Sequence, residues 1–410
     1  MNAPIPGSTV TPEQPYFRLV LPLFALTFAA WIDHLLMVPL SADISQDTGL
    51  AIENSGLLVS VYPVAAALSA FGFAPFSDRL GRKKLLILLG SGFAITTLGC
   101  ALAPNVFTIL LFRILSGAFA GPIMPNCLAY AGDALQGRDR SRAITHVMLG
   151  FTMASIVGVP IGAWLAEWSS WRWAFAAVML STVGTTFFLA TLPDIPTGAQ
   201  GKVLRQYMEM LGLLKRPEVR LVFAMQFFML IGLFGFIPNL SAWLTVNFGL
   251  TASAIGLSYM YGGIGSLLGN QGAGWLMARG LRLSLISGGS LLMALVLVVA
   301  TQEVIPAAWT GAMLFGLMLG GSVRMPGLQA VLTELTGIEI RGRLMAMSMI
   351  VSNLTMGLGG FWSTAVLYME NGRLEGMQTV GYIALACLLT IPLLAWRIQH
   401  HLRASAPHLG

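Results

Sequence analysis

The sequence has 410 residues, of which 56% are hydrophobic and 10% are charged, with a mean hydropathy of +0.76. Soluble globular chains carry roughly 25% charged residues, so this composition cannot form a water-facing surface. Apolar runs of about twenty residues recur along the whole chain, each long enough to cross a hydrocarbon core of about 30 Å as a helix. The sequence therefore predicts an all-α, multi-pass integral membrane protein.

Twelve membrane-spanning helices are predicted, in two groups of six. The proline-rich stretch 1–16 indicates a disordered tail and not a signal peptide. The polar stretch 193–219 is interpreted as a cytoplasmic linker and 399–410 as a second tail, so that six-helix bundles would occupy 17–192 and 220–398. The predicted spans are 17–40, 54–76, 84–104, 106–128, 144–166, 172–192, 220–244, 254–277, 283–302, 306–328, 343–367 and 376–398.

Basic and acidic residues sort into alternate loops between these spans. One set of loops contains clusters such as Arg138, Arg140 and Arg142, whereas the other contains mainly acids such as Asp43 and Asp47. By the positive-inside rule, the basic loops and both termini face the cytoplasm, and a bacterial inner membrane is the expected location. The balance of 23 Lys and Arg against 17 Asp and Glu therefore encodes topology and does not indicate nucleic-acid binding.

An internal repeat relates the two halves of the chain at a shift of about 200 residues. The matches keep their order along the chain and respect the span boundaries, which indicates a duplicated unit. Two six-helix halves of this kind can rock about a central site. The matching pairs include Arg79 with Arg279, Arg82 with Arg282, Met124-Pro125 with Met325-Pro326, Asp133 with Glu334, and Arg140 and Arg142 with Arg341 and Arg343.

The loop after the second span reads Ala-Pro-Phe-Ser-Asp-Arg-Leu-Gly-Arg-Lys-Lys from Ala74 to Lys84. It resembles the loop motif of the major facilitator superfamily, a Gly followed by Asp-Arg-x-Gly-Arg-Arg/Lys, with Ala74 in place of the first Gly. A glycine permits the tight turn between two spans. The resemblance implies a charged cytoplasmic gate, and the alternative is that its basic residues only fix orientation. The predicted gate residues are Asp78, Arg79, Gly81, Arg82, Asp133 and Arg142.

Arg113 lies inside the fourth span, four residues before Gly117, a spacing that resembles a second motif of this superfamily. It lies about seven residues, or about 10 Å, from the outer end of its helix, where an unpaired charge is costly. Asp33 in the first span is expected at a similar depth and is the predicted partner. A carboxylate beside an Arg in a cavity can take up and release protons, so we expect Asp33 and Arg113 to couple proton movement. A permanent pair that only joins two helices is the alternative.

Small residues recur at four-residue intervals in the fifth span, at Gly150, Ala154, Gly158 and Gly162. Such a face allows another helix to pack closely, and Pro160 is expected to bend the helix. The run from Gly158 to Gly162 resembles the antiporter motif of drug-efflux members, with Val159 where Gly commonly precedes the proline. Ordinary helix packing is the alternative interpretation.

Intramembrane polar and aromatic residues are the candidates for substrate contact. Arg324 either adds a positive charge to a central cavity or extends to the cytoplasmic surface. The other members could equally stabilise helix packing. The predicted substrate-binding residues are Trp31, His34, Tyr62, Asn239, Arg324 and Asn353. The sequence contains no nucleotide-binding loop, metal-ligand spacing or nucleophile constellation, so no cofactor, no metal and no enzymatic activity are expected.

Together, the motifs and topology make the chain similar to the major facilitator superfamily, and most like its proton-linked drug and metabolite efflux branch. The resemblance implies twelve helices in two bundles and a monomeric transporter working by alternating access. Its expected partners are a small-molecule substrate, protons and the lipid bilayer. Uptake or exchange of an organic anion is an alternative, because Arg113, Arg324 and His34 outnumber Asp33. A receptor or membrane enzyme is disfavoured because the chain has no sizeable soluble domain and no reactive cluster at an interface.

Overall fold

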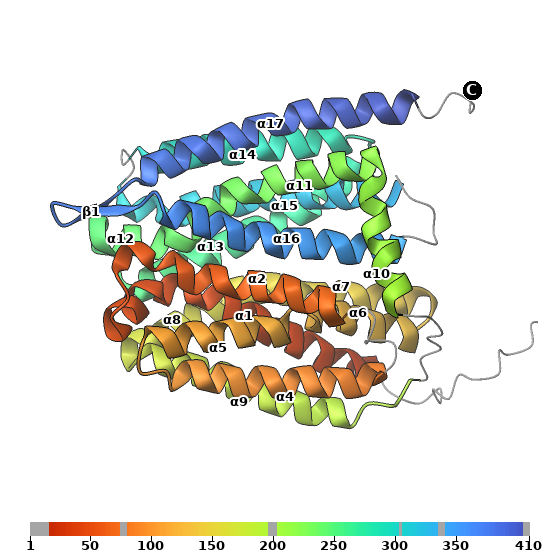
Figure 1. Ribbon diagram of the computed structural model, residues 1–410, viewed down its shortest axis with the longest axis horizontal. Helices are drawn as coiled ribbons and strands as arrows, with labels where there is room; N and C mark the ends of the chain where they lie inside the picture. Colours follow the sequence, from red (N-terminus) through yellow and green to blue (C-terminus); the bar gives the residue numbers. More distant parts are fainter. Residues whose placement is uncertain (1–15, 74–79, 196–202, 303–305, 335–340, 405–410) are drawn as a thin grey trace, which may run out of the picture.

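The computed structural model describes residues 16–73, 80–195, 203–302, 306–334 and 341–404. Nearly all of these residues are helical, and most helices run along one common direction (Figure 1). The first half contains α1 (Tyr16–Thr48), α2 (Gly56–Phe73), α4 (Arg82–Ala101), α5 (Val106–Ala120), α6 (Ile123–Ala134), α7 (Gly137–Met153), η2 (Ala154–Gly158), α8 (Val159–Trp168) and α9 (Trp171–Ala190).

The second half begins after a short amphipathic helix, α10 (Val203–Gly212), which lies across the end of the molecule that carries the C-terminus (Figure 1). Its elements are α11 (Pro217–Phe236), η4 (Ile237–Asn239), α12 (Leu240–Phe248), α13 (Ala252–Met277), α14 (Arg282–Thr301), α15 (Thr310–Glu334), α16 (Arg341–Thr364), the hairpin strands β1 (Tyr368–Glu370) and β2 (Arg373–Glu375), and α17 (Met377–Ala404). Short 3-10 turns lie at Ile52–Asn54, Leu213–Lys215 and Ala307–Trp309.

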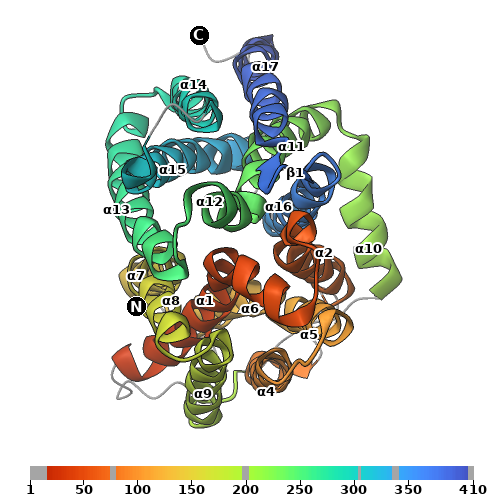
Figure 2. The same ribbon diagram turned by 90° about the vertical axis from the view of Figure 1, so that its left-hand side faces the viewer.

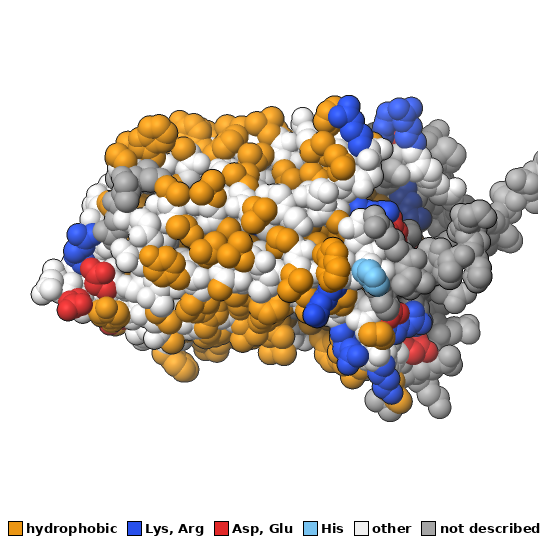
Figure 3. All heavy atoms as spheres, turned by 90° about the horizontal axis from the view of Figure 1, so that it is seen from above, with side chains coloured by type: hydrophobic (Ala, Val, Ile, Leu, Met, Phe, Trp, Pro, Cys, Tyr) orange, Lys and Arg blue, Asp and Glu red, His pale blue; other side chains and the backbone are white. Residues whose placement is uncertain are grey.

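Ten helical stretches of the described residues are long and apolar enough to cross a membrane. The 26-residue α13 and the 25-residue α15 lie between them and are long enough to accompany them across. These elements are consistent with the twelve predicted spans. Apolar side chains cover the middle of the molecule, and charged side chains gather at its two ends (Figure 3). The all-helical membrane fold is therefore confirmed.

The two halves of the chain form two groups of helices that face each other (Figure 2). In the first half α4 packs against α5 and α9, and in the second half α15 packs against α13 and α14. The halves meet where α2 packs against α16, α8 against α13, and α1 against α12. Each half thus has its own helix packing, and these helix pairs are among the contacts that join the halves.

Several predicted boundaries differ from the structure, among them the end of the first span, the fourth span and the linker. The first span was predicted to end at residue 40, but α1 continues to Thr48, because Ser41 and Thr48 donate hydrogen bonds to carbonyls of their own helix and remain buried. The span 106–128 instead breaks at Gly121, where α5 ends, and α6 extends to Ala134. The stretch predicted as a linker contains α10 and the first residues of α11.

Candidate functional site

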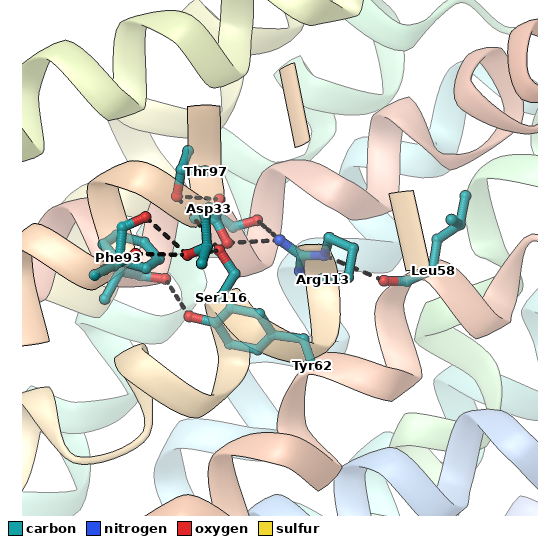
Figure 4. Close-up of polar contacts among 10 residues, drawn as sticks. Asp33, Leu58, Tyr62, Phe93, Thr97, Arg113 and Ser116 are labelled. Carbon is teal, nitrogen blue, oxygen red and sulfur yellow. Dashed lines mark hydrogen bonds and ion pairs between the residues drawn. The ribbon is translucent and has the colours of Figure 1, made fainter. Parts of the chain in front are cut away.

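A buried ion pair lies within the first half, between α1 and α5 (Figure 4). Arg113 Nη1 lies 2.5 Å from Asp33 Oδ2, and both side chains have no exposed surface. The same nitrogen donates to the Asp33 backbone carbonyl at 3.3 Å, and Arg113 Nε donates to Leu58 O of α2 at 3.4 Å. The structure therefore brings together the two residues that the sequence predicted as partners.

A hydroxyl group of α4 contacts the carboxylate, and a hydroxyl group of α5 contacts that residue of α4 (Figure 4). Thr97 Oγ1 donates to Asp33 Oδ1 at 3.4 Å, and it also lies 3.4 Å from Ser116 Oγ. Sequence reasoning did not identify Thr97 or Ser116 as part of this site. Hydroxyl residues are common in membrane helices, so only the three-dimensional packing of α4 beside α1 and α5 distinguishes these two.

Aromatic side chains adjoin the ion pair. The Arg113 guanidinium lies 4.5 Å from the centre of the Tyr62 ring, and the His34 imidazole stacks on the same ring at 5.0 Å. Trp31 contacts His34 edge-on at 6.1 Å and Phe151 of α7 at 5.0 Å. We call Trp31, His34, Tyr62 and Phe151 the aromatic cluster. His34 and Tyr62 are buried, whereas Trp31 and Phe151 are half-buried, so the cluster extends outward from the enclosed pair.

Two buried nitrogens at this place have no hydrogen-bond partner among the described residues, Arg113 Nη2 and His34 Nδ1. Buried polar atoms in proteins are nearly always hydrogen-bonded, so two unsatisfied nitrogens beside the same ring are unusual. The buried thiol of Cys100 interacts electrostatically with Arg113 and Asp33. The site therefore has spare hydrogen-bonding capacity in an enclosed environment.

Close packing of α5 on α2 brings Arg113 to the Tyr62 ring. A Cβ atom at Gly117 would overlap the Tyr62 carbonyl, and one at Gly121 would overlap Ala66 of the same helix. Only glycine permits this approach, because any side chain would separate the helices. The four-residue spacing from Arg113 to Gly117 is thus explained by the contact between these helices.

The expected depth of the ion pair needs one correction. Arg113 is seven residues from the start of α5 at Val106, as predicted. Asp33 is not seven residues from the end of its helix but fifteen, since α1 ends at Thr48 (48 − 33 = 15). The two residues meet because α1 extends beyond the start of α5, a feature that the apolar run alone did not indicate.

Arg324 of α15 is fully enclosed within the second half and does not extend to the surface. Its Nη2 donates to Met229 O of α11 at 2.6 Å, Nη1 lies 3.5 Å from Ser290 Oγ of α14, and Nε has no partner. No carboxylate pairs with it among the ion pairs of the described residues. Arg324 lies fourteen residues into α15 (324 − 310 = 14), so its depth was overestimated by assuming a helix start at 306.

The two asparagines predicted to contact substrate bond to neighbouring protein groups. Asn239 is buried, donates to Ser363 Oγ at 2.8 Å and accepts from Thr364 Oγ1 at 3.5 Å. Asn353 is half-buried and donates to Met349 O of its own helix at 3.1 Å. The structure thus gives Asn239 a role in joining η4 to α16, and it does not bring either asparagine to the ion pair.

The predicted cytoplasmic gate is only partly described. Arg82 Nε lies 3.0 Å from Asp133 Oδ2, joining α4 to α6, and Gly81 has the positive φ of 80° that the predicted turn needs. Arg142 does not join this pair, because its described partner is Asp139, three residues earlier on α7, at 3.8 Å. Asp78 and Arg79 lie outside the described residues.

The repeat has a structural counterpart at this end of the molecule. Arg282 of α14 pairs with Glu334 of α15, in the positions that match Arg82 and Asp133. Sequence comparison aligned these residues without predicting that the second pair forms. The second ion pair could have been predicted from the repeat, since Arg82 and Asp133 had each been matched to a residue of the same charge.

The small-residue face of the fifth span packs against α1. Gly150 lies beside Thr27, Gly158 beside Ile32, and Gly162 beside Leu36, where an added Cβ would fall 2.7 Å from the leucine. Pro160 follows η2, a five-residue π-helical segment from Ala154 to Gly158. A bend was expected at Pro160, and the structure has a widened, π-helical turn just before this residue.

A model of the Major Facilitator Superfamily matches residues 23–360. The chain belongs to the major facilitator superfamily. Its fold resembles that of a nucleoside transporter, NupG, with a TM-score of 0.74 at 16% identity over 93% of this chain and 99% of that one. It also resembles a bacterial homologue of the lysosomal transporter Spinster in an inward-facing, unoccupied conformation, with a TM-score of 0.72 at 16% identity over 95% and 98% of the two chains.

Two relatives show the range of sequence similarity. A gallate transporter of Pseudomonas putida is 35% identical over 183 residues, which cover 44% of this chain and 39% of that protein. An uncharacterised transporter of this type in Bacillus subtilis (strain 168), YfhI, is 25% identical over 375 residues, covering 91% of this chain and 92% of the relative. The chain is therefore a membrane transporter of the major facilitator type.

Proposed function

We propose that this transporter moves a small organic solute together with, or against, protons by alternating access, and that Asp33 carries the proton. The observation that carries the proposal is the enclosed pair of Asp33 with Arg113. A buried carboxylate opposite one guanidinium has two discrete states, paired and protonated, and conversion between them can bias a conformational equilibrium. Thr97 and the aromatic cluster supply further contacts that a protonated Asp33 would rearrange.

The contacts between the halves support an arrangement that is closed at the end remote from the termini. Ser155 Oγ of η2 donates to Tyr259 O of α13 at 2.9 Å, and Ser241 Oγ of α12 donates to Pro39 O of α1 at 3.0 Å. Both hydrogen bonds join the halves toward that end. If the termini are cytoplasmic, this arrangement corresponds to an inward-facing state, in which the site receives solute from the cytoplasm.

Both halves of the transport pathway come from one chain, which supports a monomer in the cell inner membrane as the working unit. Arg82 with Asp133, and Arg282 with Glu334, lie at the opposite end from the closed contacts. We propose that these pairs position the loops that close the cytoplasmic side in the alternate state. Arg142 is assigned to this side with Asp139 as its neighbour.

Two substrate classes each have a specific observation in their favour. An organic anion is favoured by the buried guanidinium groups of Arg113 and Arg324, which outnumber the buried carboxylate of Asp33 among the described residues. Similarity to a gallate transporter agrees with this class. Export of drugs or small metabolites by antiport is favoured by the run Gly158 to Gly162, which resembles the antiporter motif and lies at the junction of η2 and α8 against α1.

Coupled transport can be tested in proteoliposomes that contain a pH-sensitive dye. With an acidic lumen, external ethidium tests antiport, and gallate loaded inside tests proton symport. In either mode solute movement should make the lumen more alkaline. Asp33→Asn should abolish the dye signal and solute accumulation while retaining solute exchange at equal pH, since an amide cannot carry the proton.

The control for this experiment is Glu370→Gln, which removes an exposed carboxylate from β1 and should leave the dye signal unchanged. Ethidium movement alone would assign antiport export, and gallate movement alone would assign anion symport. A dye response in Asp33→Asn equal to that of the unaltered protein would contradict the role given to Asp33.

A further inference from the structure

The unsatisfied nitrogens of the ion-pair site specify what kind of group can complete it. Arg113 Nη2 carries only N–H donors, so its missing partner must be a hydrogen-bond acceptor. Because the donor is charged and enclosed, an anionic oxygen forms the stronger bond. His34 Nδ1 lies next to the same Tyr62 ring and can donate to a second oxygen of that group. A carboxylate supplies both acceptors.

Charge balance links this carboxylate to a proton. The titratable or charged side chains around Asp33 are Arg113, which pairs with it, Tyr62 and Cys100, and His34 stacks on the Tyr62 ring. Of these, Arg113 alone carries a fixed positive charge, and Asp33 already neutralises it. A second carboxylate beside an ionised Asp33 would leave one uncompensated negative charge in an enclosed site. Once Asp33 takes up a proton from water, one incoming carboxylate restores neutrality.

The aromatic cluster specifies the remainder of the molecule. Arg113 and His34 are buried, whereas Trp31 and Phe151 are half-buried and contact each other edge-on at 5.0 Å. A carboxylate bound at the deep end would therefore place its attached group beside these two rings. Aromatic rings favour edge-on or offset contacts with other rings. An aromatic cation would place a second positive charge beside Arg113 and leave Nη2 unsatisfied.

We propose that Arg113, His34 and the aromatic cluster bind a small aromatic monocarboxylate, which enters together with one proton on Asp33. This assignment rests on the proposed proton-coupled transport and names its substrate class and ratio. The carboxylate replaces Asp33 as the counter-ion of Arg113, the proton stays on Asp33, and the loaded site is electrically neutral. Release of both on the far side returns Asp33 to Arg113.

Equilibrium binding to the detergent-purified full chain tests the ligand class directly. The probes are 4-hydroxybenzoate, cyclohexanecarboxylate, which lacks the aromatic ring, and 4-hydroxybenzamide, which lacks the charge. Calorimetric titration should show 4-hydroxybenzoate binding about tenfold or more tightly than either analogue. Trp31→Leu should weaken 4-hydroxybenzoate about threefold to tenfold. Trp164→Leu, which removes a lipid-facing ring on α8, should not change the affinity.

The same titrations measure how many protons the protein takes up on binding. In buffers of different ionisation enthalpy, the unaltered protein should take up one proton for each 4-hydroxybenzoate bound. Asp33→Asn should bind at least as tightly and take up none, because the amide resembles a protonated carboxyl group. Equal affinity for the three probes, or binding without proton uptake by the unaltered protein, would overturn the inference.

The inference can fail while the proposed function stands. If none of the three probes binds and gallate drives no dye signal, but ethidium still drives one that Asp33→Asn abolishes, the chain is proton-coupled and its substrate is not of this class. If 4-hydroxybenzoate binds as expected in detergent, but no solute moves protons in proteoliposomes, the coupled transport itself is wrong.

Discussion

Asp33 and Arg113 are each fully enclosed, so the stability of either charge depends on the other. Desolvation of two ions is costly, and their attraction offsets this cost only with close geometry and further hydrogen bonds. Thr97 and Leu58 O provide such bonds. This explains how a charged pair persists in an apolar bundle, and why the loss of one member differs from the loss of both.

A stability measurement can test this dependence. We expect Arg113→Gln to lower the free energy of unfolding by about 3–5 kcal/mol, because it leaves a buried carboxylate without its counter-ion. Adding Asp33→Asn to the same chain should restore more than half of the loss. Unfolding of the purified protein in a denaturing detergent gives both values.

The control for that measurement is the more exposed pair of Arg82 with Asp133, where Arg82→Gln should change stability by about 0–1 kcal/mol. If the changes in the free energy of unfolding caused by Asp33→Asn and by Arg113→Gln simply added in the double variant, the two side chains would not be coupled in the folded protein.

Residue-level prediction from the sequence succeeded where physical chemistry leaves few choices. A charge within an apolar run needs a partner, and Asp33 was the carboxylate within a predicted span that could pair with Arg113, although its depth was predicted from the wrong helix end. The same reasoning could not select Thr97, Ser116 or Phe151, because hydroxyl and aromatic side chains are stable at many positions in membrane helices. Only the packing of α4 and α7 against α1 and α5 identifies them.

At the level of elements, glycines determine how closely the halves approach. On α16, a Cβ at Gly357 would fall 2.8 Å from the Ser60 carbonyl of α2, so this contact requires a residue without a side chain. The close packing of α16 on α2 therefore depends on the glycine in the sequence of α16, in addition to any effect of bound substrate.

Accessibility of a distant residue tests the role of this glycine. In a chain whose three native cysteines are replaced by alanine, Ser241→Cys reports on the contact of α12 with α1, where Ser241 is buried. Gly357→Leu should raise labelling of this cysteine by an impermeant maleimide at least about fivefold, by shifting the population toward the open state. Labelling is quantified by gel shift of the purified protein.

The matched control is Gly272→Leu, which lies on an exposed part of α13 with no atom near the added side chain. It should leave labelling of Ser241→Cys unchanged. Equal labelling with and without Gly357→Leu would show that the α2–α16 contact does not hold this end closed.

Element boundaries were predicted less well than element identity, because hydropathy detects apolar length and not helix length. Residues 41–48 are largely polar yet helical, since their hydroxyls bond within the helix and their apolar neighbours remain buried. The break at Gly121 was not predicted, although Pro122 follows it and a proline has no N–H to continue the helix.

At the level of the whole molecule, basic residues dominate the end that carries the C-terminus (Figure 3). This distribution agrees with the cytoplasmic placement that the positive-inside rule predicts for both termini. The repeat in the sequence matched Arg82 with Arg282 and Asp133 with Glu334, and these residues form ion pairs at equivalent positions of the two halves, although the second pair was not predicted. The division into two halves and the charged ends of the molecule could thus be predicted, since the repeat and the positions of the charged residues can be read directly from the sequence.

Reporter fusions test the orientation. Green fluorescent protein fused to the C-terminus should fluoresce, because it folds in the cytoplasm. Alkaline phosphatase should be active when fused after Gly372, in the hairpin of β1 and β2, and inactive after Gly280, between α13 and α14. Both glycines occupy positive-φ turns, at 76° and 77°, so the two fusion sites are matched locally. The reverse pattern of activity would invert the proposed orientation and the assignment of the closed end.

The unexpected length of α1 has a mechanical consequence. This helix behaves as a lever with Asp33 near its middle, and Pro39 lies six residues beyond Asp33 toward the closed end, about 9 Å along the axis. A tilt of about 10° around Asp33 would displace Pro39 by about 1.6 Å and the far tip at Thr48 by about 4 Å. The smaller displacement already exceeds what the 3.0 Å hydrogen bond from Ser241 to Pro39 tolerates. A small change of helix tilt at one buried charge would thereby become a displacement of ångströms where α1 meets the other half.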